Sequence, residues 1–231
     1  MRIRGRVPGE MNSAPPAGEF RQLVVIGASL GGLNALKTVL SALPPDFPCP
    51  IVVVQHREKT TEDLLTGLLE TVCALPVAET EDKEPVAWGR VYLAPVNYHL
   101  LVEEGHFALS VDGPVNHTRP SIDVLFESAA EAYGERVVGV ILTGANEDGA
   151  RGLAAVKENG GIAVVQDPST AEAPRMPEAA LAAVTADAVL PLEAIGPFLT
   201  RLSTGRGGRS KQKASPGSRN SPWRSSRNVR R

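Results

Sequence analysis

Short apolar runs alternate with segments of helical periodicity along most of this 231-residue chain. Residues 23–26, 51–54 and 137–142 are apolar almost throughout, which is typical of strands covered on both faces. Over residues 33–40 and 64–72, apolar side chains recur at three- and four-residue spacing, which indicates helices. This alternation predicts an α/β fold: a doubly wound, mostly parallel sheet with helices on both faces.

The same patterns predict the remaining elements. We expect further strands at 91–93, 162–165 and 188–190, and further helices at 122–133, 149–159, 177–184 and 192–202. Two more short apolar runs, 100–102 and 107–111, flank Glu103-Glu104-Gly105-His106. This spacing predicts a β-hairpin, which we expect as an antiparallel addition to the parallel sheet.

Charge divides the chain into unequal parts. The net charge is −2, but residues 203–231 hold nine Lys or Arg and no Asp or Glu, so residues 1–202 carry about −11. We expect a disordered segment at 1–20, one folded domain at 21–202 and a basic disordered tail at 203–231. The tail is either a solvated segment that offsets the acidic domain or a tether to an anionic partner such as nucleic acid, a membrane surface or an acidic protein.

Cysteine use and hydropathy bear on the compartment. Cys49 and Cys73 are far apart and match no metal or redox spacing, which favours a reducing environment. No apolar run approaches the roughly 18 residues needed to cross a bilayer, and no apolar stretch follows the basic start of the chain to form a signal peptide. We therefore expect a cytoplasmic protein.

Reactive side chains follow several of the predicted strands. Ser29 follows the first strand within a glycine-rich turn, His56 follows the second, and Asp148 and Asp167 follow two later ones. Because the carboxyl ends of parallel strands meet at one edge of a sheet, these residues are expected on the same rim. A serine, a histidine and an acid are the nucleophile, base and orienting group that acyl transfer requires.

Each of these residues also has a structural explanation. Ser29 fits a turn residue or helix cap, as most serines before helices are. His56 fits a strand-end histidine bonded to backbone, Asp148 fits a cap for the helix that follows it, and Asp167 before Pro168 fits a turn. The residues alone leave these alternatives open.

Two other kinds of site are disfavoured. In a dinucleotide-binding loop, Ser29 would occupy the place of the second glycine, and Gln55-His56 stands where an acid would bind the ribose. The remaining histidines, His99, His106 and His117, show no metal-ligand spacing, although His99 and His117 fit positions near the rim. We expect neither a metal nor an organic cofactor.

Several motifs, in order, resemble the catalytic domain of the CheB-type protein-glutamate methylesterases of bacterial chemotaxis. The resemblance spans roughly residues 22–202 and rests on Ile26-Gly27-Ala28-Ser29 with Gly31-Gly32, Gln55-His56, Tyr92-Leu93-Ala94-Pro95, Asp112-Gly113-Pro114 through Asn116, Arg119 to Phe126, Gly139 to Gly144, Asp148-Gly149-Ala150 and Met176-Pro177.

The resemblance implies a role for each candidate residue. Ser29 corresponds to the family nucleophile, His56 to its base and Asp148 to its orienting acid. By its position in the loop before Asp148, Ala145 is the candidate for a backbone N–H donor to the oxyanion. The implied reaction is hydrolysis of glutamate methyl esters on chemoreceptor helices to glutamate and methanol, with deamidation of receptor glutamines as an additional activity. No specific nucleic-acid binding is implied.

This chain departs from the family pattern at four positions near the motifs. Leu30 stands where threonine is common, Asn146 and Arg175 where glycine is common, and Glu178 where a basic residue often follows Met-Pro. These departures leave open a second function, a weakly active or inactive receptor-binding module.

The segment before the first strand also differs from many family members. Because only about 20 residues precede that strand, we expect no attached receiver domain. Three alternatives stay open: a constitutive protein, control by a separate protein, or a place in a signalling array that does not serve flagellar chemotaxis.

Overall fold

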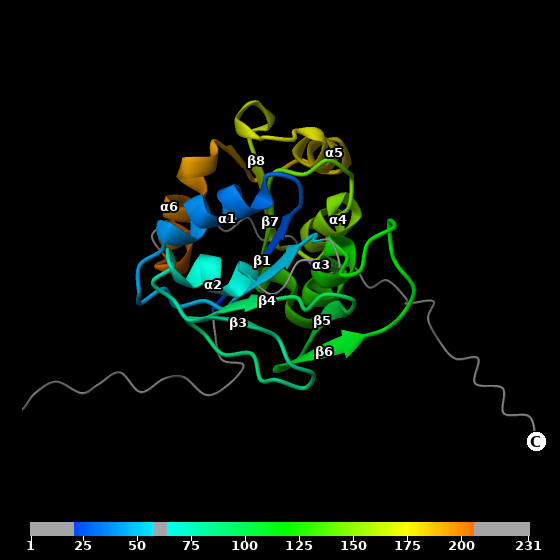
Figure 1. Ribbon diagram of the computed structural model, residues 1–231. Coiled ribbons are helices and arrows are strands. Elements are labelled where there is room, and N and C mark those ends of the chain that lie inside the picture. The colour runs from blue at the N-terminus through cyan, green and yellow to red at the C-terminus, as the bar shows by residue number, and fades with distance from the viewer. Residues whose placement is uncertain (1–20, 58–63, 206–231) are drawn as a thin grey trace, which may run out of the picture.

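Seven strands form one parallel sheet at the centre of the molecule (Figure 1). The computed structural model describes residues 21–57 and 64–205. The sheet has the order β3-β4-β2-β1-β7-β8-β9, and every neighbouring pair is parallel. Its strands are β1 (Leu23–Ala28), β2 (Ile51–Gln55), β3 (Val77–Glu79), β4 (Val91–Leu93), β7 (Val137–Ile141), β8 (Ile162–Gln166) and β9 (Ala188–Leu190).

Helices cover both faces of this sheet (Figure 1). One face packs against α1 (Gly32–Ser41), α2 (Leu64–Glu70) and α6 (Leu192–Ser203), and the other against α3 (Ile122–Tyr133), α4 (Ala150–Glu158) and α5 (Arg175–Ala183). The expected doubly wound α/β architecture is thereby confirmed.

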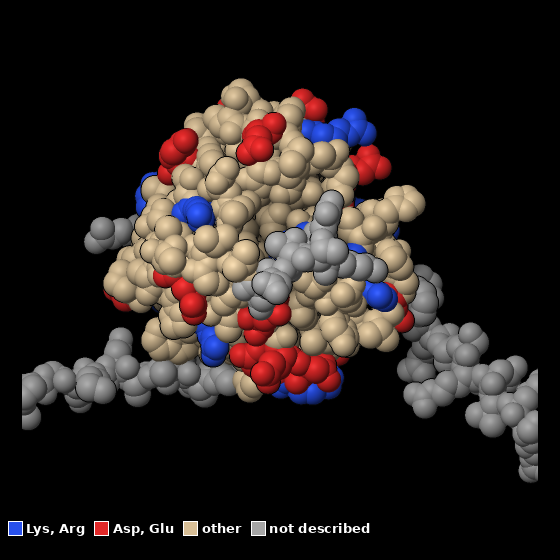
Figure 2. Space-filling view, viewed as in Figure 1, with Lys and Arg blue, Asp and Glu red and all other residues tan. Residues whose placement is uncertain are grey.

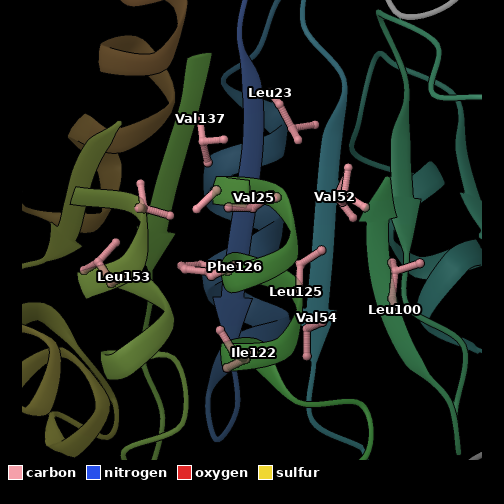
Figure 3. Close-up of a cluster of buried hydrophobic side chains, with 14 of the residues drawn as sticks. Leu23, Val25, Val52, Val54, Leu100, Ile122, Leu125, Phe126, Val137 and Leu153 are labelled. Carbon is pink, nitrogen blue, oxygen red and sulfur yellow. The ribbon is translucent and has the colours of Figure 1, made fainter. Parts of the chain in front are cut away.

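Strand β1 shows why the strands are apolar throughout. Val24 and Ile26 belong to the core cluster beneath α1, α2 and α6, whereas Leu23 and Val25 belong to the cluster beneath α3, α4 and α5. Figure 3 shows the second cluster, in which side chains of α3 such as Phe126 lie against the sheet. Successive side chains of a strand point to opposite faces, so a strand covered on both faces favours apolar residues at every position.

The predicted hairpin is confirmed and forms a two-stranded sheet of its own. Strands β5 (His99–Glu103) and β6 (His106–Ser110) are antiparallel and pack on α3. The Val102 N–H donates to Ser128 Oγ at 3.1 Å, and the Gly105 N–H donates to Tyr133 Oη at 2.8 Å. The hairpin therefore covers α3 and extends neither edge of the main sheet.

The remaining differences from the predicted elements are small. The sequence patterns missed β3, whose three residues include a single buried side chain, Val77. Helix α5 begins at Arg175, two residues earlier than expected, because Pro177 is tolerated in the first helical turn. Two short 3₁₀ helices, Gly134–Arg136 and Pro168–Thr170, complete the fold.

The predicted chain ends fall largely outside the described residues. The folded domain was expected to end at residue 202, and α6 continues to Ser203. The N-terminal segment 1–20 and residues 206–231 of the basic tail lie outside the described ranges, so both assignments stay predictions. Among the helices that the structure describes, none is long and apolar enough to cross a membrane.

Acidic side chains are unevenly spread over the visible face. Figure 2 shows Asp and Glu gathered at its lower edge, where the segment between β3 and β4 runs in Figure 1. This segment contains Glu81, Asp82 and Glu84, of which the first two are exposed. The negative charge expected for residues 1–202 is therefore concentrated in part at one edge.

The strand order also defines where a ligand site is expected. From β1, the chain continues through β2 to β3 and β4 on one side, and later through β7, β8 and β9 on the other. In an open parallel sheet, such a reversal of direction leaves a crevice beyond the carboxyl ends of the central strands. Here these strands are β2, β1 and β7.

Candidate active site

Three loops meet at the carboxyl ends of the central strands. Ser29 directly follows β1, and its N–H donates to the Thr143 carbonyl at 3.0 Å. His56 directly follows β2, and its N–H donates to the Ala28 carbonyl at 3.0 Å. Asp148 lies in the loop between β7 and α4. All three loops thus lie at the crevice that the strand order defines.

The His56 ring and the Asp148 carboxylate are directly bonded. His56 Nε2 lies 2.9 Å from Asp148 Oδ2, with the carboxylate fully buried and the imidazole 11% exposed. An ionised carboxylate only accepts hydrogen bonds, so Nε2 carries the hydrogen and a neutral ring keeps its lone pair on Nδ1. The pair therefore fixes the tautomer of His56.

Asp148 accepts hydrogen bonds from several directions. Six donors lie between 2.7 and 3.2 Å from its two oxygens: His56 Nε2, Thr118 Oγ1, Ser121 Oγ, Asn116 Nδ2 and the N–H groups of Ile122 and Asp123. The last two N–H groups open α3 and are otherwise without a partner in their own helix. Asp148 therefore caps α3 from a distant part of the sequence, whereas the predicted alternative was a cap for the helix that directly follows it.

These contacts keep the carboxylate ionised. Burial alone raises the pKa of Asp148, but hydrogen bonds from His56, the Ile122 N–H and the Ser121 hydroxyl outweigh it and lower the pKa from 3.8 to about 2. The partial positive charge at the N-terminus of α3 acts in the same direction.

A second buried carboxylate supports the first. Asp123 Oδ1 accepts from the N–H groups of Gly149 and Gly152 at 2.9 and 2.7 Å, which fastens the start of α4 to α3. Asn116 Nδ2 donates to both carboxylates, at 2.8 Å to Asp123 and 3.1 Å to Asp148. Asn116 and Asp123 lie within motifs that carry the family resemblance, which are the sequence signal for them, but no role was predicted for either residue.

The turn that holds Ser29 is fixed by Gln55. Gln55 Nε2 donates to the carbonyls of Ser29 and His56 at 2.8 and 3.0 Å. Gly31 has a φ of +76°, and a Cβ on Gly32 would overlap Gln55 Oε1. Glycine at position 31 is therefore favoured by the backbone conformation, and glycine at position 32 by the close packing of Gln55. Gly31 is also the N-cap residue of α1. The alternative explanation of Ser29 as the cap of this helix is therefore not supported.

The loop before Asp148 is attached to α5. The Gly144 N–H donates to the Ala173 carbonyl at 3.0 Å, and the Met176 N–H donates to the Gly144 carbonyl at 2.9 Å. A Cβ on Gly144 would overlap the end of the Met176 side chain and lie 3.0 Å from Ser29 Cβ. This packing explains the Met176-Pro177 motif. Ala145 follows Gly144 and is exposed.

An open pocket lies above the His56–Asp148 pair. It measures about 570 Å³ and is lined by Ser29, His56, Leu30 and Asn146, among others. Leu30 is 57% exposed at its rim. Asn146 Nδ2 lies 3.5 Å from His56 Nδ1. The pocket therefore gives solvent access to Ser29 and to His56, whose Nδ1 is the ring nitrogen not bonded to Asp148.

The other candidate residues do not line the pocket beside Ser29. Asp167 caps the 3₁₀ helix 168–170 through Ser169, which agrees with the turn explanation. His99 is buried next to the site: its Nε2 bonds to the Gly113 carbonyl, and its Nδ1 accepts from the N–H of Ser121, whose hydroxyl donates to Asp148. His106 pairs with Glu103. Across residues 21–57 and 64–205, no cluster of three His, Cys, Asp or Glu side chains forms a metal site.

Comparison with known proteins gives concordant matches. The family model described as CheB methylesterase matches residues 24–199. A relative from Leptospira interrogans is 51% identical over 182 residues, covering 78% of this chain and 94% of the relative. A protein-glutamate methylesterase/protein-glutamine glutaminase of Anaeromyxobacter dehalogenans is 45% identical over 84% of this chain and 57% of its own length.

A solved structure agrees with these matches. The crystal structure of the Thermotoga maritima CheB methylesterase catalytic domain matches with a TM-score of 0.75 and 38% identity. The match covers 78% of this chain and 98% of that domain. On the strength of the fold, the family model and these relatives, the chain belongs to the CheB methylesterase family.

Proposed function

We propose that this protein is a serine hydrolase that converts glutamate 5-O-methyl esters on chemoreceptor helices to glutamate and methanol. The observation that carries this proposal is the buried hydrogen bond of 2.9 Å between His56 and Asp148 beneath a pocket lined by Ser29. The names of the relatives, which include protein-glutamate methylesterase, supply the substrate class.

The first half-reaction forms an ester with the enzyme. Ser29 Oγ attacks the carbonyl carbon of the substrate ester, and its proton moves to His56 Nδ1. Asp148 stabilises the imidazolium through Nε2. The carbon–methoxy bond then breaks, and the leaving oxygen takes the proton from Nδ1 and departs as methanol.

The second half-reaction restores the enzyme. A water molecule gives a proton to His56 Nδ1 and attacks the glutamyl carbonyl carbon. The bond to Ser29 Oγ breaks, and the oxygen recovers the proton from Nδ1. The direct products are the glutamate side-chain carboxylic acid, which releases the second proton of the water to solvent and becomes a carboxylate, and the resting serine.

The backbone N–H of Ala145 is our candidate donor to the oxyanion in both steps. This choice is supported by the preceding residue, Gly144, whose carbonyl accepts from the Met176 N–H and whose Cβ position lies 3.0 Å from Ser29 Cβ. One such donor typically contributes about 3 kcal/mol to the transition state.

The same groups suit a second substrate. A receptor glutamine presents the same carbonyl with ammonia as leaving group, and the relatives also carry the name protein-glutamine glutaminase. A separate regulatory protein and an anionic partner of the basic tail stay predictions.

Methanol release from a methylated receptor tests the proposal. Ser29→Ala and His56→Ala should each reduce release by at least about 10⁴-fold, because the two side chains act as a unit. Ser110→Ala, on the distant strand β6, serves as the matched serine control and should retain activity. Equal release by the wild type and both site variants would refute catalysis and leave the receptor-binding module.

A further inference from the structure

Asn146 stands beside the catalytic base in a defined orientation. Its Oδ1 accepts from the Asp148 N–H at 3.2 Å, and its Nδ2 lies 3.5 Å from His56 Nδ1. The reverse orientation of the amide would place Nδ2 against the Asp148 N–H, which is itself a donor. The amide is therefore held with its N–H₂ group toward the imidazole nitrogen that faces the pocket.

This position coincides with that of the leaving group in the proposed reaction. The leaving atom takes its proton from His56 Nδ1, so it must come within hydrogen-bond distance of that nitrogen. Asn146 Nδ2 has two hydrogens, of which only one can point at Nδ1. A leaving atom that approaches Nδ1 from the side of Asn146 therefore also comes within reach of a hydrogen-bond donor on Asn146.

An ester and an amide respond differently to that donor. In the tetrahedral intermediate of a methyl ester, the methoxy oxygen has two lone pairs, one for the His56 proton and one for Asn146. In the intermediate of a primary amide, the leaving nitrogen has a single lone pair, which His56 uses. Its two N–H bonds are donors and have no acceptor in the Asn146 N–H₂ group.

From this geometry we propose that Asn146 is a specificity-determining residue that favours methyl esters over primary amides. The inference rests on the proposed function, and it concerns the choice between the two substrates. Glycine, which is common at this position in the family that the sequence resembles, has no side chain to make the distinction.

Two product assays on the same variants test the inference. Methanol release is measured with a methylated receptor, and ammonia release with the same receptor carrying glutamine at those sites. For Asn146→Ala and Asn146→Gly, the ratio of kcat/KM for the ester to that for the amide should fall about two- to tenfold, the range of one hydrogen bond. The fall should come mainly from the ester. Glu147→Gln is the matched control. Glu147 is the exposed neighbour of Asn146, and its carboxylate pairs with Arg175 at 3.3 Å, so this variant should leave the ratio unchanged.

The outcomes separate the two proposals. An equal loss of both activities in the Asn146 variants would indicate a merely structural role for the side chain and overturn the inference. An unchanged ratio in a folded Asn146→Gly variant would do the same if Asn146→Ala fails to fold. A wild-type protein that releases neither product would overturn the proposed function, and the inference with it.

Discussion

The Ile122 N–H, at the start of α3, donates to Asp148 Oδ2 at 2.7 Å. The Asp148 carboxylate is thus bound to a helix N-terminus as well as to His56. A helix end positions a carboxylate through fixed backbone groups, which lose little freedom when the bond forms. The same interaction links the stability of the fold to the geometry of the site.

Asp148→Asn should strongly reduce turnover, although the two side chains have nearly the same size. The variant amide can donate to His56 Nε2 and shift the ring hydrogen to Nδ1, the nitrogen that accepts the serine proton in the proposed reaction. The corresponding change in serine proteases lowers kcat by about 10⁴-fold, and we expect a similar loss of methanol release. Asp167→Asn, in an exposed turn, is the matched control and should retain full activity. A mild effect of Asp148→Asn would contradict the assigned tautomer.

The same variant should change how stability depends on pH. The pKa of Asp148 is about 2 in the folded protein and 3.8 for an ordinary aspartate, so the ionised form stabilises the fold by about 2 kcal/mol above pH 4. That contribution is lost as the pH falls from about 4 to 2. The free energy of unfolding, measured by urea denaturation, should therefore differ between wild type and Asp148→Asn at pH 6, and this difference should shrink as the pH approaches 2. A difference that stays constant over this range would exclude the linkage.

Asn116 bridges the buried carboxylates of Asp123 and Asp148, so substitutions at this position should affect stability through these two charges. Asn116→Gly removes the bridging amide while allowing the φ of +50°, so we expect a loss of about 1 kcal/mol in the free energy of unfolding. Asn116→Asp keeps the size but places a third carboxyl group against Asp123 and Asp148. Its loss should be larger, about 2–3 kcal/mol at pH 8, and should diminish toward pH 4 as the new group is protonated. Equal stability of the two variants at pH 8 would show that charge is unimportant there.

The parts of the site that could be predicted from sequence are the residues whose positions follow from the order and direction of the strands. Parallel strands put the residues that follow them at one edge, so Ser29, His56 and Asp148 could be grouped from their place after apolar runs. The strands themselves were recognisable because both faces are covered. Strand β3 was not predicted because its three residues hold a single large apolar side chain, Val77, whereas β9, at the other edge, holds two.

The support of the site could not be predicted in the same way. The donors to Asp148 include backbone N–H groups, which every non-proline residue carries and which leave no side-chain signature. Ser121 and Asn116 bond to Asp148 although they lie 27 and 32 positions away in the sequence. Both belong to the segment between β6 and α3, which forms neither helix nor strand. It is Nε2 of His56, and not Nδ1, that bonds to the Asp148 carboxylate. This depends on the orientation of the imidazole ring, which no spacing in the sequence determines.

The turn that holds Ser29 allows a test with two glycines. A Cβ on Gly32 would overlap Gln55 Oε1 and lie 2.8 Å from its Cδ and 2.9 Å from Ala28 Cβ, so Gly32→Ala must displace the side chain that holds the Ser29 carbonyl. We expect a loss of about 1–3 kcal/mol in the free energy of unfolding, together with reduced methanol release. Gly67 lies in α2 with nothing within 4 Å of its Cβ position, so Gly67→Ala should stabilise the protein by up to about 1 kcal/mol and leave activity unchanged. Urea denaturation and the methanol assay on both variants distinguish packing at the turn from a general effect of replacing glycine. A Gly32→Ala variant with wild-type activity would show that Gln55 does not need its present position to hold the serine.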